Sequence, residues 1–100
     1  MLYIKDVKPG TLALSADAAG NHVVVLNVRQ TGKVLSVLDQ CSNEATAPGF
    51  TLVHNGLESD AEFDYTCTLD NVQCGFSAVT ARVIRQALYA ACLKLCRTEE

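Results

Sequence analysis

The sequence predicts an α+β fold, in which an antiparallel β-meander sheet of four to six strands carries one C-terminal amphipathic helix packed on one face. Two observations lead to this fold class. Short apolar and β-branched runs, separated by turn residues, occupy residues 2–69, and a helical repeat of apolar residues follows at about 77–97. A chain of 100 residues is of ordinary single-domain size, so we expect one domain over residues 1–100.

Turn residues divide the predicted sheet into strands. Pro9 and Gly10 favour a turn at residues 8–10, a loop is expected at 17–21, and Gly32 favours a tight turn at 30–32. A further strand is expected to stop at Asn55-Gly56. The expected strands are residues 2–7, 11–16, 22–29, 33–39, 50–54 and 58–69, with irregular segments at 40–49 and 70–75.

The last predicted strand shows the clearest alternation in the chain. One face carries Phe63, Tyr65, Cys67 and Leu69, and the other carries Glu62, Asp64, Thr66 and Thr68. A period of two is typical of a strand with one buried and one solvated face. We therefore expect the polar face of this strand to point away from the core.

The C-terminal helix is predicted from its cap and from its apolar stripe. Ser77 is a suitable N-cap, because its hydroxyl can accept a free backbone N–H of the first turn. The expected buried positions follow the helical spacing and are Ile84, Ala87, Leu88, Ala91 and Leu95.

Charge is distributed unevenly along the chain. Seven of the eleven acidic residues lie between Lys33 and Arg82, a segment that contains no lysine or arginine. The other four acidic residues share the rest of the chain with all eight basic residues. The net charge of −3 therefore combines an acidic middle with two mildly basic ends. Such segregation bears on partners and association rather than on fold.

A row of carboxylates within the acidic segment is the leading candidate site. Glu58, Asp60, Glu62 and Asp64 occur at every second position, so a strand beginning at residue 58 would point all four the same way, about 6–7 Å apart. This spacing resembles that of phosphates along a nucleic-acid strand, and Asp70 extends the acidic surface. The alternative is a solvated edge strand whose charges prevent aggregation.

Metal sites are a weaker interpretation of the same residues. An EF-hand calcium loop fails, because Tyr65 stands where glycine is needed and Asn71 where glutamate is needed. The five cysteines contain no Cys-x-x-Cys pair, so buried inert thiols are favoured over a zinc site or a disulfide framework. We therefore expect no metal and no cofactor.

No catalytic motif accompanies the two histidines, His22 and His54, so we expect a protein that is not an enzyme. A second surface is the mildly basic outer side of the helix, with Arg82, Arg85 and Tyr89. This surface could meet the acidic strand of another copy and form a homodimer. Direct nucleic-acid binding is not expected, because basic residues are too few.

These observations favour a small protein-interaction module that binds a basic protein surface. One form is an inhibitor, encoded by a phage or mobile element, that mimics nucleic acid. The first alternative is a homo-oligomeric structural or assembly subunit that uses its open sheet face, and the second is a cysteine-based metal or small-molecule binder. We expect no membrane association and a cytoplasmic location, because no signal peptide or membrane span is visible.

Overall fold

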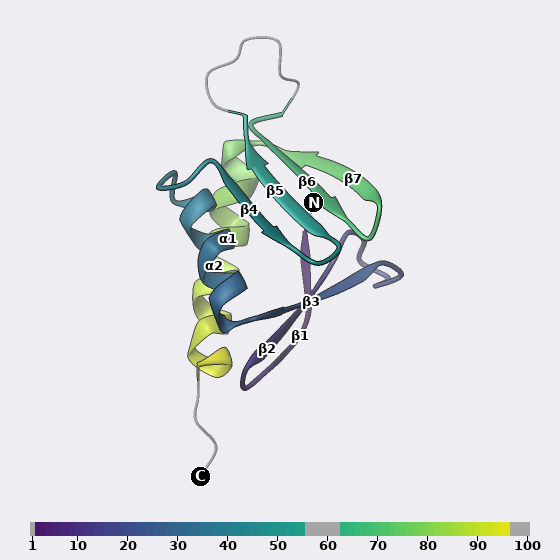
Figure 1. Cartoon of the computed structure of the whole chain (residues 1–100), viewed down its shortest axis with the longest axis vertical. Coiled ribbons are helices and arrows are strands. Elements are labelled where there is room, and N and C mark those ends of the chain that lie inside the picture. Colours follow the sequence, from purple (N-terminus) through teal and green to yellow (C-terminus); the bar gives the residue numbers. More distant parts are fainter. Residues whose placement is uncertain (1, 56–62, 97–100) are drawn as a thin grey trace.

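The computed structural model, which describes residues 2–55 and 63–96, shows an α+β fold with two antiparallel sheets, a middle helix and a C-terminal helix (Figure 1). The first sheet has the order β1-β2-β3 and the second the order β4-β5-β6-β7. The elements in chain order are β1 (Tyr3–Lys8), β2 (Thr11–Ser15), β3 (Val23–Asn27), α1 (Val28–Leu38), β4 (Glu44–Ala47), β5 (Phe50–His54), β6 (Tyr65–Leu69), β7 (Val72–Phe76) and α2 (Ala78–Leu95).

The expectation of a single sheet with a single helix is wrong, because α1 separates two sheets. We expected a turn at residues 30–32 and a strand at 33–39, but the chain is helical through this region as far as Leu38. Asn27 caps this helix: its side chain accepts the N–H of Gln30, and the Gln30 side chain accepts the N–H of Asn27. Val34 and Leu38 are buried on the side of α1 that faces the core. Residues 33–39 also fit the alternation of a strand, so alternation alone does not distinguish strand from helix. The capping box of Asn27 and Gln30 indicates the helix.

Two strands lie in segments that we expected to be irregular. β4 occupies part of residues 40–49, and β7 occupies most of residues 70–75, beyond the predicted limit of residue 69. A two-residue turn joins β6 to β7, in which Asp70 and Asn71 have φ of 50° and 65°. Two consecutive left-handed residues are typical of the type I′ turn, whose twist matches that of a hairpin. Aspartate and asparagine tolerate this conformation better than other non-glycine residues.

The strand expected at residues 58–69 begins at Tyr65 in the described part of the chain. Residues 58–62 lie outside the described residues. Phe63 and Asp64 form a bend before β6, and Phe63 is 41% exposed, so its predicted place on the buried face beside Tyr65 is wrong. The prediction is confirmed for Tyr65, Cys67 and Leu69, which are all buried.

The C-terminal helix is confirmed. The Ser77 side chain accepts the N–H of Thr80 at 3.3 Å and caps α2. Ile84, Leu88 and Leu95 are buried as expected, whereas Ala87 is exposed and Ala91 is only half-buried. The buried stripe therefore lies slightly to one side of the predicted one.

The buried side chains of both sheets and both helices form one apolar cluster. Leu12, Leu14 and Leu26 enter it from the first sheet, and Leu52 and Leu69 from the second. α1 packs against β3, β4 and β5, and α2 packs against β1 and α1, so the helices hold the two sheets together. None of the described helices is long and apolar enough to cross a membrane.

Candidate interaction surfaces

The acidic residues expected to bind a partner do not continue as one row along β6. Asp64 precedes this strand and Asp70 follows it, so they stand about 20 Å apart along the extended chain. Both residues are exposed. Glu58, Asp60 and Glu62 lie outside the described residues.

Asp64 also stabilises the start of α2. Its Oδ2 accepts a hydrogen bond from the backbone N–H of Ala78 at 2.8 Å. A carboxylate at this position is favoured, because the N-terminus of a helix carries a partial positive charge. The alternation of the sequence did not indicate this structural role, which only the approach of β6 to α2 creates.

Asp70 lies at the opposite end of β6, in the turn to β7. Its Oδ2 is 3.4 Å from Nδ1 of His22, on the chain that enters β3. This contact is an ion pair only when His22 is protonated. The turn is also joined to the β4–β5 turn, because the N–H of Asp70 donates to the carbonyl of Gly49 at 2.9 Å.

The outer face of the four-stranded sheet is polar apart from Val53, which lies opposite Thr66. Tyr65, Cys67 and Leu69 of β6 point into the core, so Thr66 and Thr68 point outward. The strand register places Thr68 between Thr51 of β5 and Gln73 of β7. Both helices lie on the other side of this sheet (Figure 1), so no described helix covers the outer face of β4–β7. A helix packed over the polar side of β6 would bury that side and exclude an acidic binding face. Among the described elements, no helix lies there.

Two of the three residues expected to mediate self-association bind within the chain. Arg85 Nη1 donates to Asp39 Oδ1 at 2.8 Å, and the Tyr89 hydroxyl donates to Asp39 Oδ2 at 2.5 Å. The hydrogen bond from Tyr89, together with Arg85, holds the pKa of Asp39 below its ordinary value, and the same bond raises the pKa of Tyr89. This network links the C-cap of α1 to α2.

The contacts of Asp39 with α2 are not predicted by the sequence, because the alternation of residues 33–39 predicts that Asp39 ends a strand. A helix ending at residue 38 would have indicated them, since a side chain at the C-cap can reach a neighbouring helix. Within the described part of the chain, Arg82 makes no hydrogen bond or ion pair.

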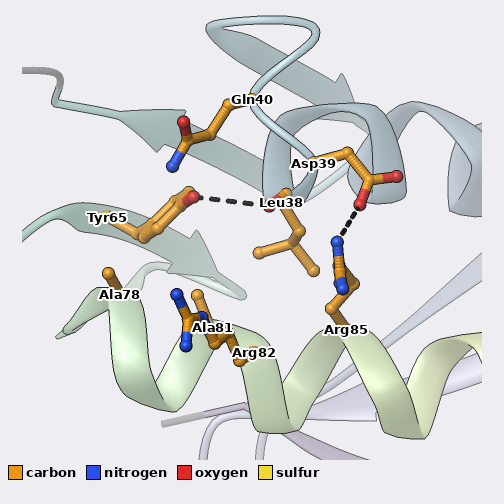
Figure 2. A pocket seen from close by; sticks show the side chains of 8 residues that line it. All are labelled: Leu38, Asp39, Gln40, Tyr65, Ala78, Ala81, Arg82 and Arg85. Atoms are coloured by element: carbon orange, nitrogen blue, oxygen red, sulfur yellow. Dashed lines mark hydrogen bonds and ion pairs between the residues drawn. The ribbon is translucent and has the colours of Figure 1, made fainter.

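A cleft of about 450 Å³ lies between the end of α1, the start of β6 and the first half of α2. Figure 2 shows Gln40 and Tyr65 on one side and Arg82 on the other, with Arg85 turned toward Asp39. Arg85 Nε is buried without a hydrogen-bond partner. The carboxylate of Asp39 pairs with Arg85, one of the two guanidinium groups that line the cleft, and we assign the cleft no ligand.

All five cysteines are free thiols. Cys67 and Cys74 are opposite each other on β6 and β7. The interaction with Cys74, together with burial, raises the pKa of Cys67, whereas the hydrogen bond with Cys67 lowers the pKa of Cys74 to about 6. Among residues 2–55 and 63–96, no group of three or more His, Cys, Asp or Glu side chains could hold a metal ion.

The two histidines lie apart from these thiols. His22 contacts Asp70, and the ring of His54 packs at 4.8 Å between centroids against the ring of Tyr65. No hydrogen bond joins a histidine to a cysteine or hydroxyl group in the part of the chain that the structure describes. The geometry therefore offers no specific pairing for nucleophilic catalysis.

Comparison with models of protein families, with curated proteins and with solved structures finds no match to this chain.

Proposed function

We propose that this chain is a small non-enzymatic protein-interaction domain that binds a basic protein surface at the end of the molecule formed by β4–β7. The observation that carries the proposal is the outer face of this sheet, which no described helix covers, which is polar apart from Val53 and which belongs to a segment without lysine or arginine. Glu44 and Asp70 are exposed on β4 and in the β6–β7 turn. A basic partner therefore meets no like charge on these strands.

The distribution of charge along the sequence supports binding through the same strands. All of β4–β7 lies between Lys33 and Arg82, whereas every basic residue belongs to the rest of the chain. Charge on a binding surface that is complementary to its partner steers the encounter of the two and raises the association rate. Binding of this kind weakens steeply with salt, because exposed charges are screened beyond about 8 Å at physiological ionic strength.

The finer form of this proposal is an inhibitor, of the kind that phages and mobile elements encode, that mimics nucleic acid and occupies the basic groove of its target protein. It depends on Glu58, Asp60 and Glu62, which are outside the described residues, together with Asp64. Asparagine at position 64 retains an oxygen that can accept the N–H of Ala78, so Asp64→Asn removes charge while keeping the cap of α2.

The test compares two double variants that change the net charge equally. Glu62→Gln with Asp64→Asn alters the acidic segment, and Glu99→Gln with Glu100→Gln alters the end of the sequence. The probe is a labelled poly-lysine peptide, whose binding is followed by fluorescence anisotropy at low and high salt. We expect the first variant to lose binding and the second to retain it. Equal losses in both variants, or binding that is indifferent to salt, would show that no specific acidic surface is involved.

A second candidate, a homo-oligomeric assembly subunit, is favoured by apolar side chains exposed on α2. Leu93 is 82% exposed and Val83 is 54% exposed, on the side of the helix that faces away from the core. Association through such groups would be only weakly dependent on salt and would respond to apolar substitutions. Sedimentation at low and high salt separates this candidate from an electrostatic one.

A further inference from the structure

We propose that two copies of this chain associate by antiparallel pairing of their β3 strands, which joins two three-stranded sheets into one six-stranded sheet. The inference rests on the edge of this sheet and does not depend on the proposed function, which concerns β4–β7.

β3 is an edge strand with main-chain groups that point away from its sheet. The N–H of Ala16 donates to the carbonyl of His22 at 3.3 Å, so the main chain of His22 faces β2. Main-chain groups alternate in direction along an antiparallel strand, so Val24 also faces β2 and Val23 and Val25 face outward. In the part of the chain that the structure describes, no hydrogen bond reaches these outward groups of Val23 and Val25.

The free edge of β3 ends at Asn27, and this limit determines the register in which the β3 strands of two copies can pair. The N–H of Asn27 donates to Gln30 Oε1 at 2.9 Å, and its carbonyl accepts the hydroxyl of Thr31 at 2.9 Å. Only Val23 and Val25 therefore remain to pair. If Val23 of one copy lies opposite Val25 of the other, each pair exchanges two hydrogen bonds, and the two-fold axis repeats the pair.

The side chains along this edge are apolar and exposed. Val25 is 60% exposed and Val23 is 36% exposed, and both lie on the same face of β3 because they are two residues apart. Val28 follows at the start of α1 and is also exposed. Pairing would place β-branched side chains of the two copies beside one another, an arrangement that stabilises antiparallel sheets.

The other sheet edges carry features that oppose such pairing, whereas β3 does not. β1 contains Lys5, Asp6 and Lys8 and has an irregular register between Ile4 and Asp6. β4 begins with an exposed glutamate and is followed by proline, and β7 contains a glycine, which weakens a strand because it has no side chain to pack. Charges, prolines and bulges protect natural edge strands from association, and the sequence Val-Val-Val-Leu-Asn of β3 has none of these.

These observations favour a second copy of this chain as the partner that pairs with the β3 edge. The pairing of a strand with its own copy is self-complementary, and β3 carries no charge that would repel its counterpart. The contact would be one pair of five-residue strands, a small interface beside the total of about 1,200–2,000 Å² that stable complexes bury. We therefore expect a reversible dimer, with a dissociation constant in the range of about 1–100 µM.

Two valine-to-lysine variants test this interface. Val25→Lys places a charge on the β3 edge, and Val83→Lys makes the same change at a similarly exposed position on α2. Sedimentation velocity over about 5–500 µM protein would measure the dissociation constant, with circular dichroism as the check that each variant folds. We expect dimerisation that is insensitive to salt, weakened at least about tenfold by Val25→Lys and unchanged by Val83→Lys.

Hydrogen exchange of the unaltered protein provides a measurement that needs no variant. At high protein concentration the amides of Val23 and Val25 should exchange more slowly than at low concentration, whereas amides on the other edge strands should not change. The proposal is overturned by a monomer at every concentration, by a dimer that dissociates in salt, or by equal effects of the two lysine variants. Poly-lysine binding by the monomeric Val25→Lys variant tests the proposed function separately.

Discussion

Replacing Gly32 by alanine should stabilise the protein, and the sign of the effect tests whether this part of the chain is helical. Gly32 lies within α1 and is exposed. A Cβ atom at this position would meet no other atom within 4 Å, and the backbone is not in the left-handed region. In a helix interior, glycine is less favourable than alanine by about 0.8–1.0 kcal/mol. We therefore expect the free energy of unfolding to rise by about 0.8 kcal/mol.

The strand assignment predicts the opposite sign. If residues 30–32 formed a tight turn before a strand at 33–39, Gly32 would be needed for its positive φ. Alanine would then cost about 1 kcal/mol or more, because a Cβ atom is disfavoured in the left-handed region. The two interpretations thus differ by about 2 kcal/mol, which exceeds the error of a denaturation experiment.

Urea denaturation followed by circular dichroism would measure the effect. A gain of 0.8 kcal/mol corresponds to a rise in melting temperature of about 3–6 °C for a domain of this size. Gly75→Ala is the matched control, because a Cβ atom at Gly75 would overlap the ring of Phe63 and should destabilise β7. A loss of stability in Gly32→Ala would refute the reasoning and favour the turn.

Two further predictions concern the helix contacts. The carboxyl of Asp39 has a lowered pKa in the folded state because Tyr89 and Arg85 bind its charged form, so its contribution is present above the ordinary pKa of 3.8 and is lost as the pH falls through the folded value. The difference in melting temperature between the unaltered protein and Asp39→Asn should therefore shrink as the pH falls below 3.8, and a constant difference would contradict this. Leu88 is fully buried in the common core, so Leu88→Ala should lower the free energy of unfolding by about 2–5 kcal/mol. Leu93→Ala, on the exposed side of the same helix, should change it by less than about 0.5 kcal/mol in urea denaturation, and similar losses in both would show that α2 is oriented differently.

The elements predicted correctly are those whose signals are local. The turn at Pro9-Gly10 and the cap at Ser77 depend on the conformations that these residues adopt by themselves. The helical stripe of α2 is long enough to show its period, so its existence and its N-terminus were both predicted. β5 was likewise delimited by turn residues on either side.

The errors occur where one short segment fits two periods. Residues 33–39 alternate as a strand would, yet Val34 and Leu38 also have the spacing of a helix. The cap formed by Asn27 and Gln30 favours the helix, and burial of its apolar side between the two sheets stabilises it. β7 was missed because the alternation of Val72, Cys74 and Phe76 covers only five residues, includes a glycine and depends on pairing with β6.

For the candidate surfaces too, the local properties could be predicted and the long-range contacts could not. Residue order by itself determined the acidic segment, the basic character of α2 and the polar side of β6, since these follow from composition and from a period of two. Only the tertiary structure decided that Asp64 caps α2, that Asp39 binds Arg85 and Tyr89, and that β3 lies at a free edge. Each of these depends on residues far apart in the chain, and local preference carries no information about which distant segments meet when the core is buried.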